Sequence, residues 1–232
     1  ESDDFSRTLR EVFDEVFFPM LGVPHNGLET EIENFYDNIF PDLQGLTSPI
    51  PDAVSFVDWA FSHGYRIAIA TDPLLPRKAA FHRLRWAGFD PGQFELVSSY
   101  EHFHFSKTHP AYYAEVLGRM GWQEGPVLMV GNDLERDILP AKRLGLAAWL
   151  VEAEPASSPG PEADRRGTLS DLREWLESSD VSSLTPSFQS AESIVAIMSA
   201  IPAALNGLSC GLSAEAWARK RSNDDWSLTE LV

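Results

Sequence analysis

Apolar side chains in the first forty residues recur at steps of three and four, the spacing of one face of an α-helix. Over residues 3–40 this spacing predicts two helices, which Pro19, Gly22 and Pro24 separate. Residues 41–51 are rich in turn-forming side chains and predict a connector. The apolar positions that carry the pattern are Leu9, Val12, Phe13, Val16 and Phe17, followed by Ile32, Phe35, Tyr36 and Ile39.

Beyond Pro51 the pattern changes to helices that alternate with short apolar strands. Such alternation is typical of a parallel sheet with helices on both faces, and ligands bind such sheets at the carboxyl ends of the strands. We therefore expect an α/β fold with a doubly wound, Rossmann-like parallel sheet. The expected helices are 52–63, 77–87, 109–120 and 135–144, and the expected strands are 66–71, 94–98, 126–131 and 146–151.

The last third of the chain returns to helical patterns separated by linkers. Residues 152–167 are rich in Pro, Ser, Gly and Ala and predict a loop, whereas 168–179 and 190–205 predict helices. These changes predict four parts: a helical segment at 1–48, an α/β core at 49–180, a linker at 181–188 and a C-terminal helical segment at 189–232.

Composition limits the class of protein. A chain of 232 residues with 44% hydrophobic and 23% charged residues is typical of a soluble globular protein. Its net charge of -17 argues against nucleic acid and anionic membranes as partners. The single cysteine, Cys210, excludes an internal disulfide framework. We see no membrane-spanning run and no signal segment, and we expect a cytoplasmic protein. Oligomeric state is not predicted.

The strongest candidate site residues are two aspartates that follow a buried-type strand. Val127 to Val130 are continuously apolar, and Gly131 and Asn132 allow a turn, so that Asp133 emerges at the strand tip. A helix that begins there brings Asp137 to the same side one turn later. Carboxylates are hard ligands suited to Mg²⁺. The alternative is that Asp133 caps this helix and Asp137 interacts with its dipole.

Lys107 and Thr71 are weaker candidates when each is taken alone. Lys107 lies just before a helix and could balance charge on an anion, although most lysines are ordinary surface residues. Thr71 ends an apolar strand, and its hydroxyl and neighbouring N–H groups could hold a phosphoryl oxygen. Alternatively, Thr71 simply ends the strand and Asp72 forms a turn before Pro73.

Taken together, these segments resemble the haloacid dehalogenase-like (HAD) hydrolases. Ile69-Ala-Thr-Asp72 is similar to the second motif of that family, and Phe105-Ser-Lys-Thr-His-Pro110 to the third. Met129-Val-Gly-Asn-Asp-Leu-Glu-Arg-Asp-Ile138 is similar to the fourth. Two positions depart from the family pattern: Asp72 stands where Asn is frequent, and Thr108 where Pro is frequent.

The resemblance implies a role for each candidate. Thr71 would hold a phosphoryl oxygen beside Asp72 in the substrate-binding turn, Lys107 would balance charge, and Asp133 with Asp137 would hold Mg²⁺. The implied function is a Mg²⁺-dependent hydrolase, phosphatase-like, acting on a small phosphorylated metabolite through an aspartyl-phosphate, with the N-terminal helices as its cap. A metal-independent dehalogenase would not need the paired acids, and a non-catalytic binding or scaffold protein of this fold is the other alternative.

The first motif of the family, a strand ending in Asp-x-Asp, is missing from the sequence. The early acidic pair Asp3 and Asp4 has no apolar strand before it, so it predicts a helix N-terminus instead. In the family this strand lies between the strands that here end at Thr71 and Gly131. We therefore expect the chain as printed to be inactive and poorly stable alone.

The C-terminal segment resembles a different family. Residues 201–217 and 223–232 are similar to the start of a DinB-like helical-bundle domain, in which a Trp-Ser-x-x-Glu stretch opens a helix that supplies a metal-binding histidine. The alternative is a helical hairpin that packs on the α/β core.

Overall fold

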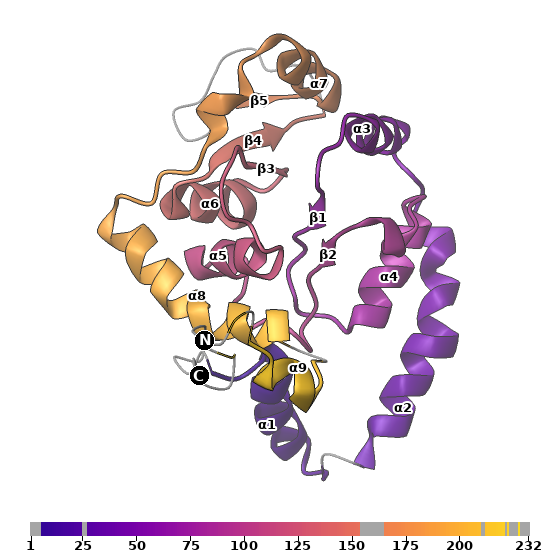
Figure 1. Ribbon diagram of the computed structural model, residues 1–232. Coiled ribbons are helices and arrows are strands. Elements are labelled where there is room, and N and C mark those ends of the chain that lie inside the picture. The colour runs from indigo at the N-terminus through magenta and orange to yellow at the C-terminus, as the bar shows by residue number, and fades with distance from the viewer. Residues whose placement is uncertain are drawn as a thin grey trace.

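The computed structural model describes residues 6–24, 27–153, 165–209, 212–220, 222 and 227. Two parallel sheets lie side by side in the centre of the molecule with helices around them (Figure 1). The predicted α/β class with parallel strand pairing is confirmed. The smaller sheet pairs β1 (Ala68–Ile69) with β2 (Leu96–Val97), and the larger one has the order β3 (Leu128–Gly131), β4 (Ala147–Val151), β5 (Arg165–Gly167).

The N-terminal helices form as the spacing predicts. At the start of helix α1 (Leu9–Leu21), the Thr8 side chain caps the helix and Glu11 completes a capping box. The helix ends at Gly22, whose φ of 69° is a conformation that favours glycine. The helix therefore starts later than residue 3. Asp3 and Asp4 lie outside the described residues.

The second N-terminal helix changes its winding along its length. Helix α2 (Glu29–Asn34) continues as a π-helical turn (Phe35–Ile39) and then as a 3₁₀ helix (Phe40–Leu46). Part of the connector expected at 41–51 is therefore helical. π-helical turns are rare in proteins overall, and many of those that occur lie at functional sites.

The helices predicted for the core are confirmed, with ends within about four residues of expectation. A second π-helical turn (Leu134–Ile138) precedes α6. The core helices are α3 (Pro51–Ser62), α4 (Arg77–Trp86), α5 (Pro110–Arg119), α6 (Leu139–Leu144) and α7 (Leu169–Ser178), and short 3₁₀ helices occupy Pro91–Gln93 and Val181–Leu184.

The strands differ from expectation in length and number. β1 and β2 pair over two residues each, where six and five were predicted, and β5 forms at the end of the segment expected to be a loop. β1 pairs with β2 on one edge and β3 pairs with β4 on one edge. Within the described residues, no strand pairs with the other edge of either β1 or β3. β3 is accordingly only half-buried, whereas Ala148, Trp149 and Leu150 of β4 are buried.

The hydrophobic core is centred on α5, which is buried along most of its length. Helix α8 (Ala191–Ser209) packs on it through small residues, so closely that a Cβ on Gly118 would overlap Ala204. Ala196, Ala200 and Ala203 of α8 join the α5 core. A short helix, α9 (Ala214–Ala218), follows. The domain boundaries predicted at 181–188 stay a prediction.

By length and composition, helix α8 is also long and apolar enough to cross a membrane. Its most apolar stretch has a mean hydropathy of 1.4, and 22% of that stretch is buried. No run of this kind was expected from the sequence. Core helices of soluble proteins meet the same criterion, and α8 buries one face on α5.

Candidate functional site

Asp133 sits where β3 turns into the π-helical turn Leu134–Ile138, and its side chain caps that turn. One carboxylate oxygen, Oδ1, accepts hydrogen bonds from the backbone N–H groups of Glu135 and Arg136, each at 3.0 Å. The capping role that the sequence left open is therefore present. It uses one of the two carboxylate oxygens.

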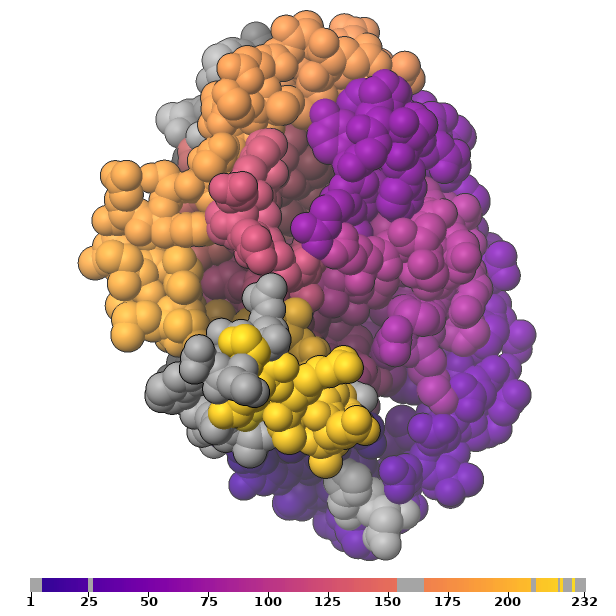
Figure 2. Space-filling view, viewed as in Figure 1, coloured from indigo at the N-terminus to yellow at the C-terminus, as the bar shows by residue number. Residues whose placement is uncertain are grey.

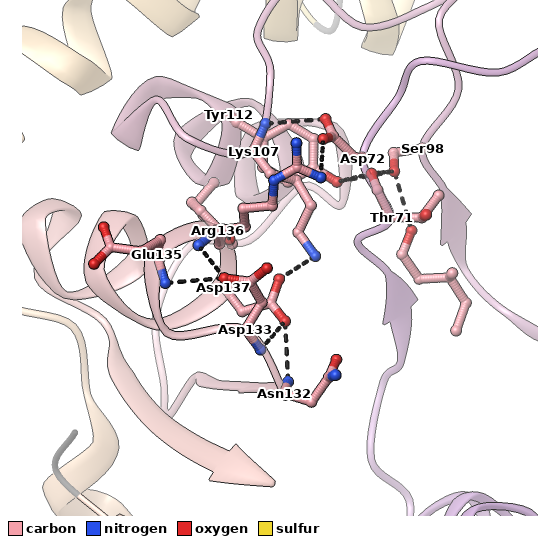
Figure 3. A network of polar contacts seen from close by, with 12 residues as sticks. Thr71, Asp72, Ser98, Lys107, Tyr112, Asn132, Asp133, Glu135, Arg136 and Asp137 are labelled. Carbon is pink, nitrogen blue, oxygen red and sulfur yellow. Dashed lines mark hydrogen bonds and ion pairs between the residues drawn. The ribbon is translucent and has the colours of Figure 1, made fainter. Parts of the chain in front are cut away.

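Asp137 is buried, with 5% of its surface exposed, and both of its oxygens are engaged (Figure 3). Oδ2 accepts from the backbone N–H groups of Asn132 and Asp133, at 3.0 and 3.1 Å. Oδ1 forms an ion pair with the Lys107 ammonium. The side chain therefore ties the tip of β3 to the loop that leads into α5.

Gly131 is required by this arrangement. A Cβ at residue 131 would overlap the carboxylate and Cβ of Asp137, which lies directly over the glycine. The sequence predicts a turn at Gly131 but not the close approach of the Asp137 side chain to this glycine.

Lys107 and Asp72 come from different segments and meet at the same place. The Lys107 side chain is 12% exposed, and its backbone N–H lies 3.5 Å from Asp72 Oδ1. The other oxygen of Asp72 lies 3.3 Å from the Arg136 guanidinium. The structure thus brings together Asp72 after β1, Lys107 before α5 and Asp137 after β3 (Figure 3). Their catalytic roles stay predictions.

Thr71 is held through its backbone. Its carbonyl accepts hydrogen bonds from the hydroxyls of Ser98, at 2.6 Å, and Tyr112, at 2.8 Å. The Tyr112 hydroxyl also lies 2.8 Å from Ser98 Oγ. These contacts fix the segment that follows β1, just before Asp72. The role of the Thr71 hydroxyl stays a prediction.

Several residues of this network were missed by the sequence analysis: Ser98, Tyr112, Tyr113 and Arg136. The Tyr113 hydroxyl donates to the Arg136 carbonyl at 2.6 Å, so α5 also anchors the π-helical turn. Burial raises the pKa of Tyr113 and the nearby Asp137 carboxylate raises it further, which keeps the phenol a neutral donor. No local pattern could have identified these residues, since their contacts join positions 14 to 41 apart.

His104 lies three residues before Lys107 in the sequence but does not join the site. It is buried, and its Nδ1 lies 2.9 Å from Glu115 Oε1, while Arg119 contacts the same carboxylate at 2.9 Å. It therefore belongs to a buried network within the core.

The two aspartates fit Mg²⁺ in the type of ligand they offer. Mg²⁺ usually takes one or two carboxylates and completes its octahedron with water and substrate oxygens. Asp133 and Asp137 supply two carboxylates at one turn, although Asp137 now holds Lys107 and two N–H groups. Among the described residues no group of three His, Cys, Asp or Glu side chains could hold a metal by itself. Further ligands would therefore come from water, substrate or another strand.

Comparison with known proteins gives relatives in both sequence and fold. The chain is similar to the glyceraldehyde 3-phosphate phosphatase of Methanothermobacter thermautotrophicus, with 29% identity over 122 residues, 53% of this chain and 53% of that protein. It thus spans about half the length of this curated relative. Its fold resembles the crystal structure of a HAD phosphatase from Thermococcus onnurineus, with a TM-score of 0.52, 20% identity, and coverage of 75% of this chain and 92% of that one.

The family match covers the two N-terminal helices, Asp72, Lys107 and both aspartates. The matching family is that of haloacid dehalogenase-like hydrolases, over residues 9–145. The DinB-like resemblance of residues 189–232 lies beyond this match and partly outside the described residues, so it is not supported here. Because the match spans more than half of the chain, the chain belongs to the haloacid dehalogenase-like hydrolase family.

Proposed function

We propose that this chain belongs to a Mg²⁺-dependent phosphatase that acts on a small phosphate ester through an aspartyl-phosphate. The observation that carries the proposal is the convergence of Asp72, Lys107 and Asp137 from three separate segments. The similarity to a protein named as a phosphatase of a small phosphorylated compound supports the same reaction class.

The chemistry divides hydrolysis into two displacements. An aspartate carboxylate would attack phosphorus and release the alcohol, and water would then attack the aspartyl-phosphate, releasing phosphate and restoring the carboxylate. From the family resemblance, this aspartate belongs to a strand between β1 and β3. Both of those strands have an edge without a partner strand in the described part of the chain, which supports the proposal.

The residues of this chain would supply charge and position. Lys107 would neutralise negative charge on the transferring phosphoryl group, and the N–H groups and hydroxyl at Thr71 would hold one of its oxygens. Mg²⁺ held by Asp133 and Asp137 would, when bound, supply further charge neutralisation. Paired acids at this position favour a phosphatase over a metal-independent dehalogenase.

The metal assignment gives the test of function. In a protein that joins this chain to the nucleophile-bearing strand, Asp133→Asn is expected to lower turnover of a phosphate ester by about a hundredfold or more, because it removes charge at the ion. Chelation of Mg²⁺ should have a comparable effect. The matched control is Asp58→Asn, which removes an exposed carboxylate on α3.

Undiminished turnover in excess chelator would contradict the metal role. A well-folded protein that carries the nucleophile and hydrolyses no phosphate ester with Mg²⁺ would favour the non-catalytic alternative.

A further inference from the structure

A cavity of about 400 Å³ lies between the N-terminal helices and the loops that follow β1 and β2. Its volume falls within the range of small-molecule sites, roughly 300 to 1,000 Å³. The molecule is hollowed between α1, in indigo, and α2, in purple (Figure 2). The apolar side chains that carry the argument are Phe13, Phe17, Ile32, Phe35, Leu74 and Tyr100.

One lining residue lies close to the proposed phosphoryl site: Leu74 comes two residues after Asp72 and donates its backbone N–H to the Asp72 carbonyl at 2.8 Å. Two residues of chain separate their Cα atoms by at most about 7.6 Å. Tyr100 lines the cavity from the loop after β2, and its N–H bonds the Leu75 carbonyl at 3.3 Å. An ester whose phosphoryl group lies at Thr71 and Asp72 would therefore extend its leaving group into this cavity.

The walls present flat aromatic surfaces. Phe13 and Phe17 stack with ring centroids 4.6 Å apart, and Tyr100 meets Phe13 edge-on at 6.4 Å. Phe13 remains 45% exposed and Phe35 on the opposite wall 40% exposed. Rings left open in this way gain most from a ligand that covers them with another ring or an extended apolar group.

Charge limits the ligand further. The described lining holds five carboxylates, those of Asp14, Glu29, Glu31, Glu33 and Glu101, and two cations. Both cations pair with carboxylates of the lining: Arg10 with Asp14 at 3.5 Å and with Glu29 at 3.9 Å, and Lys78 with Glu33 at 3.2 Å. Lys78 also pairs with Asp37 at 2.7 Å. A second anionic group on the ligand would meet net negative charge.

We propose that the cavity binds the leaving group of the substrate, and that this group is an aromatic or extended apolar alcohol without a second anionic group. The inference rests on the proposed phosphatase function and names its substrate class. A three-carbon, polar leaving group would cover little of the aromatic wall.

Binding of the alcohol alone tests the cavity separately from catalysis. The probes are naphthalene-2-methanol, the matched anion 2-naphthoate, and glycerol, each titrated into the 232-residue chain and followed by ligand-observed NMR. We expect the neutral aromatic alcohol to bind about tenfold more tightly than the anion, and glycerol not to bind. Equal affinities for the alcohol and the anion, or preferential binding of glycerol, would overturn the proposal.

Variants locate the binding. Phe13→Ala and Phe35→Ala change half-exposed rings and should each weaken alcohol binding by about fivefold or more. Met20→Ala, on α1 outside the lining, and Met198→Ala, on the exposed face of α8, are the controls. Affinity that falls with Met198→Ala and not with Phe13→Ala would place the binding elsewhere and overturn the proposal.

Hydrolysis gives the second readout, in the protein that carries the nucleophile. Naphthalene-2-methyl phosphate should have a kcat/KM at least about tenfold above that of glyceraldehyde 3-phosphate. The reverse preference would contradict the proposed substrate class but not the proposed phosphatase function. Selective alcohol binding without hydrolysis of any ester would contradict the proposed phosphatase function but not the proposed binding specificity of the cavity.

Discussion

Asp137 is a buried carboxylate, and burial of its charge is costly unless both oxygens have hydrogen-bond or ion-pair partners. Two backbone N–H groups and the Lys107 ammonium are these partners. The same contacts orient the acid beside Asp133. Structure and proposed catalysis are therefore coupled at this side chain, and changes here should affect both.

Lys107→Ala is the first residue-scale prediction. The side chains of the Lys107–Asp137 pair are 12% and 6% exposed, so the variant leaves a buried carboxylate with only its two N–H donors. We expect the free energy of unfolding to fall by about 2 to 3 kcal/mol, measured by urea denaturation. The control is Arg83→Ala, which removes an exposed cation on α4.

A double variant tests the same pair. Asp137→Asn in the Lys107→Ala background removes the uncompensated charge, so its added cost should be smaller than the cost of Asp137→Asn alone. Strict additivity of the two changes would show that the ion pair contributes nothing in solution.

Gly131→Ala is the second residue-scale prediction. The added Cβ would overlap the Asp137 carboxylate, so the acid has to move, and we expect a stability loss of about 1 to 3 kcal/mol. Turnover should fall as well. Gly45→Ala is the matched control, since nothing lies within 4 Å of its Cβ position. Similar melting temperatures for the two variants would contradict the close approach.

At the scale of elements, local pattern predicted most of the helices, because their apolar spacing and capping residues are adjacent in sequence. Gly22, a predicted boundary, ends α1 in this way, whereas the capping residue Thr8 was not identified and the helix starts later than predicted. The contacts that organise the site were not predictable, because Tyr112 on α5 reaches Thr71 across 41 residues. Strand length depends on partners as well as on composition, which explains why β1 is shorter than its apolar run.

Helix α8 gives the element-scale prediction. It contributes Ala196, Ala200 and Ala203 to the core around α5, so removing residues 189–232 should uncover that core. We expect a loss of about 3 kcal/mol or more in unfolding free energy, or failure to fold. Removal of 212–232 alone keeps α8 and should cost less. If the chain ending at residue 188 melted within a few degrees of the full chain, α8 would belong to a separate unit.

For the whole molecule, the division of the sheet is the dominant feature. β1 with β2, and β3 with β4 and β5, are all parallel pairs, as expected of one sheet. Polar contacts join Asp72 to Arg136 and Lys107 to Asp137 at their carboxyl ends. Parallel strands are normally buried on both faces, whereas β3 is half-exposed. In the proposed phosphatase, one further apolar strand would lie between β1 and β3.

The last prediction follows from that division. The 232-residue chain alone should not hydrolyse an aryl phosphate with Mg²⁺. Its stability should be low, because the edges of β1 and β3 that have no partner strand within the described residues would leave backbone groups unsatisfied. Joining an apolar strand that ends in Asp-x-Asp to its N-terminus should raise the melting temperature and produce turnover. The matched strand ending in Asn-x-Asn should raise stability equally and produce none, since only the carboxylate can attack phosphorus. Clear turnover by the unextended chain that disappears on replacing Asp3 or Asp4 would show instead that the nucleophile lies within residues 1–5.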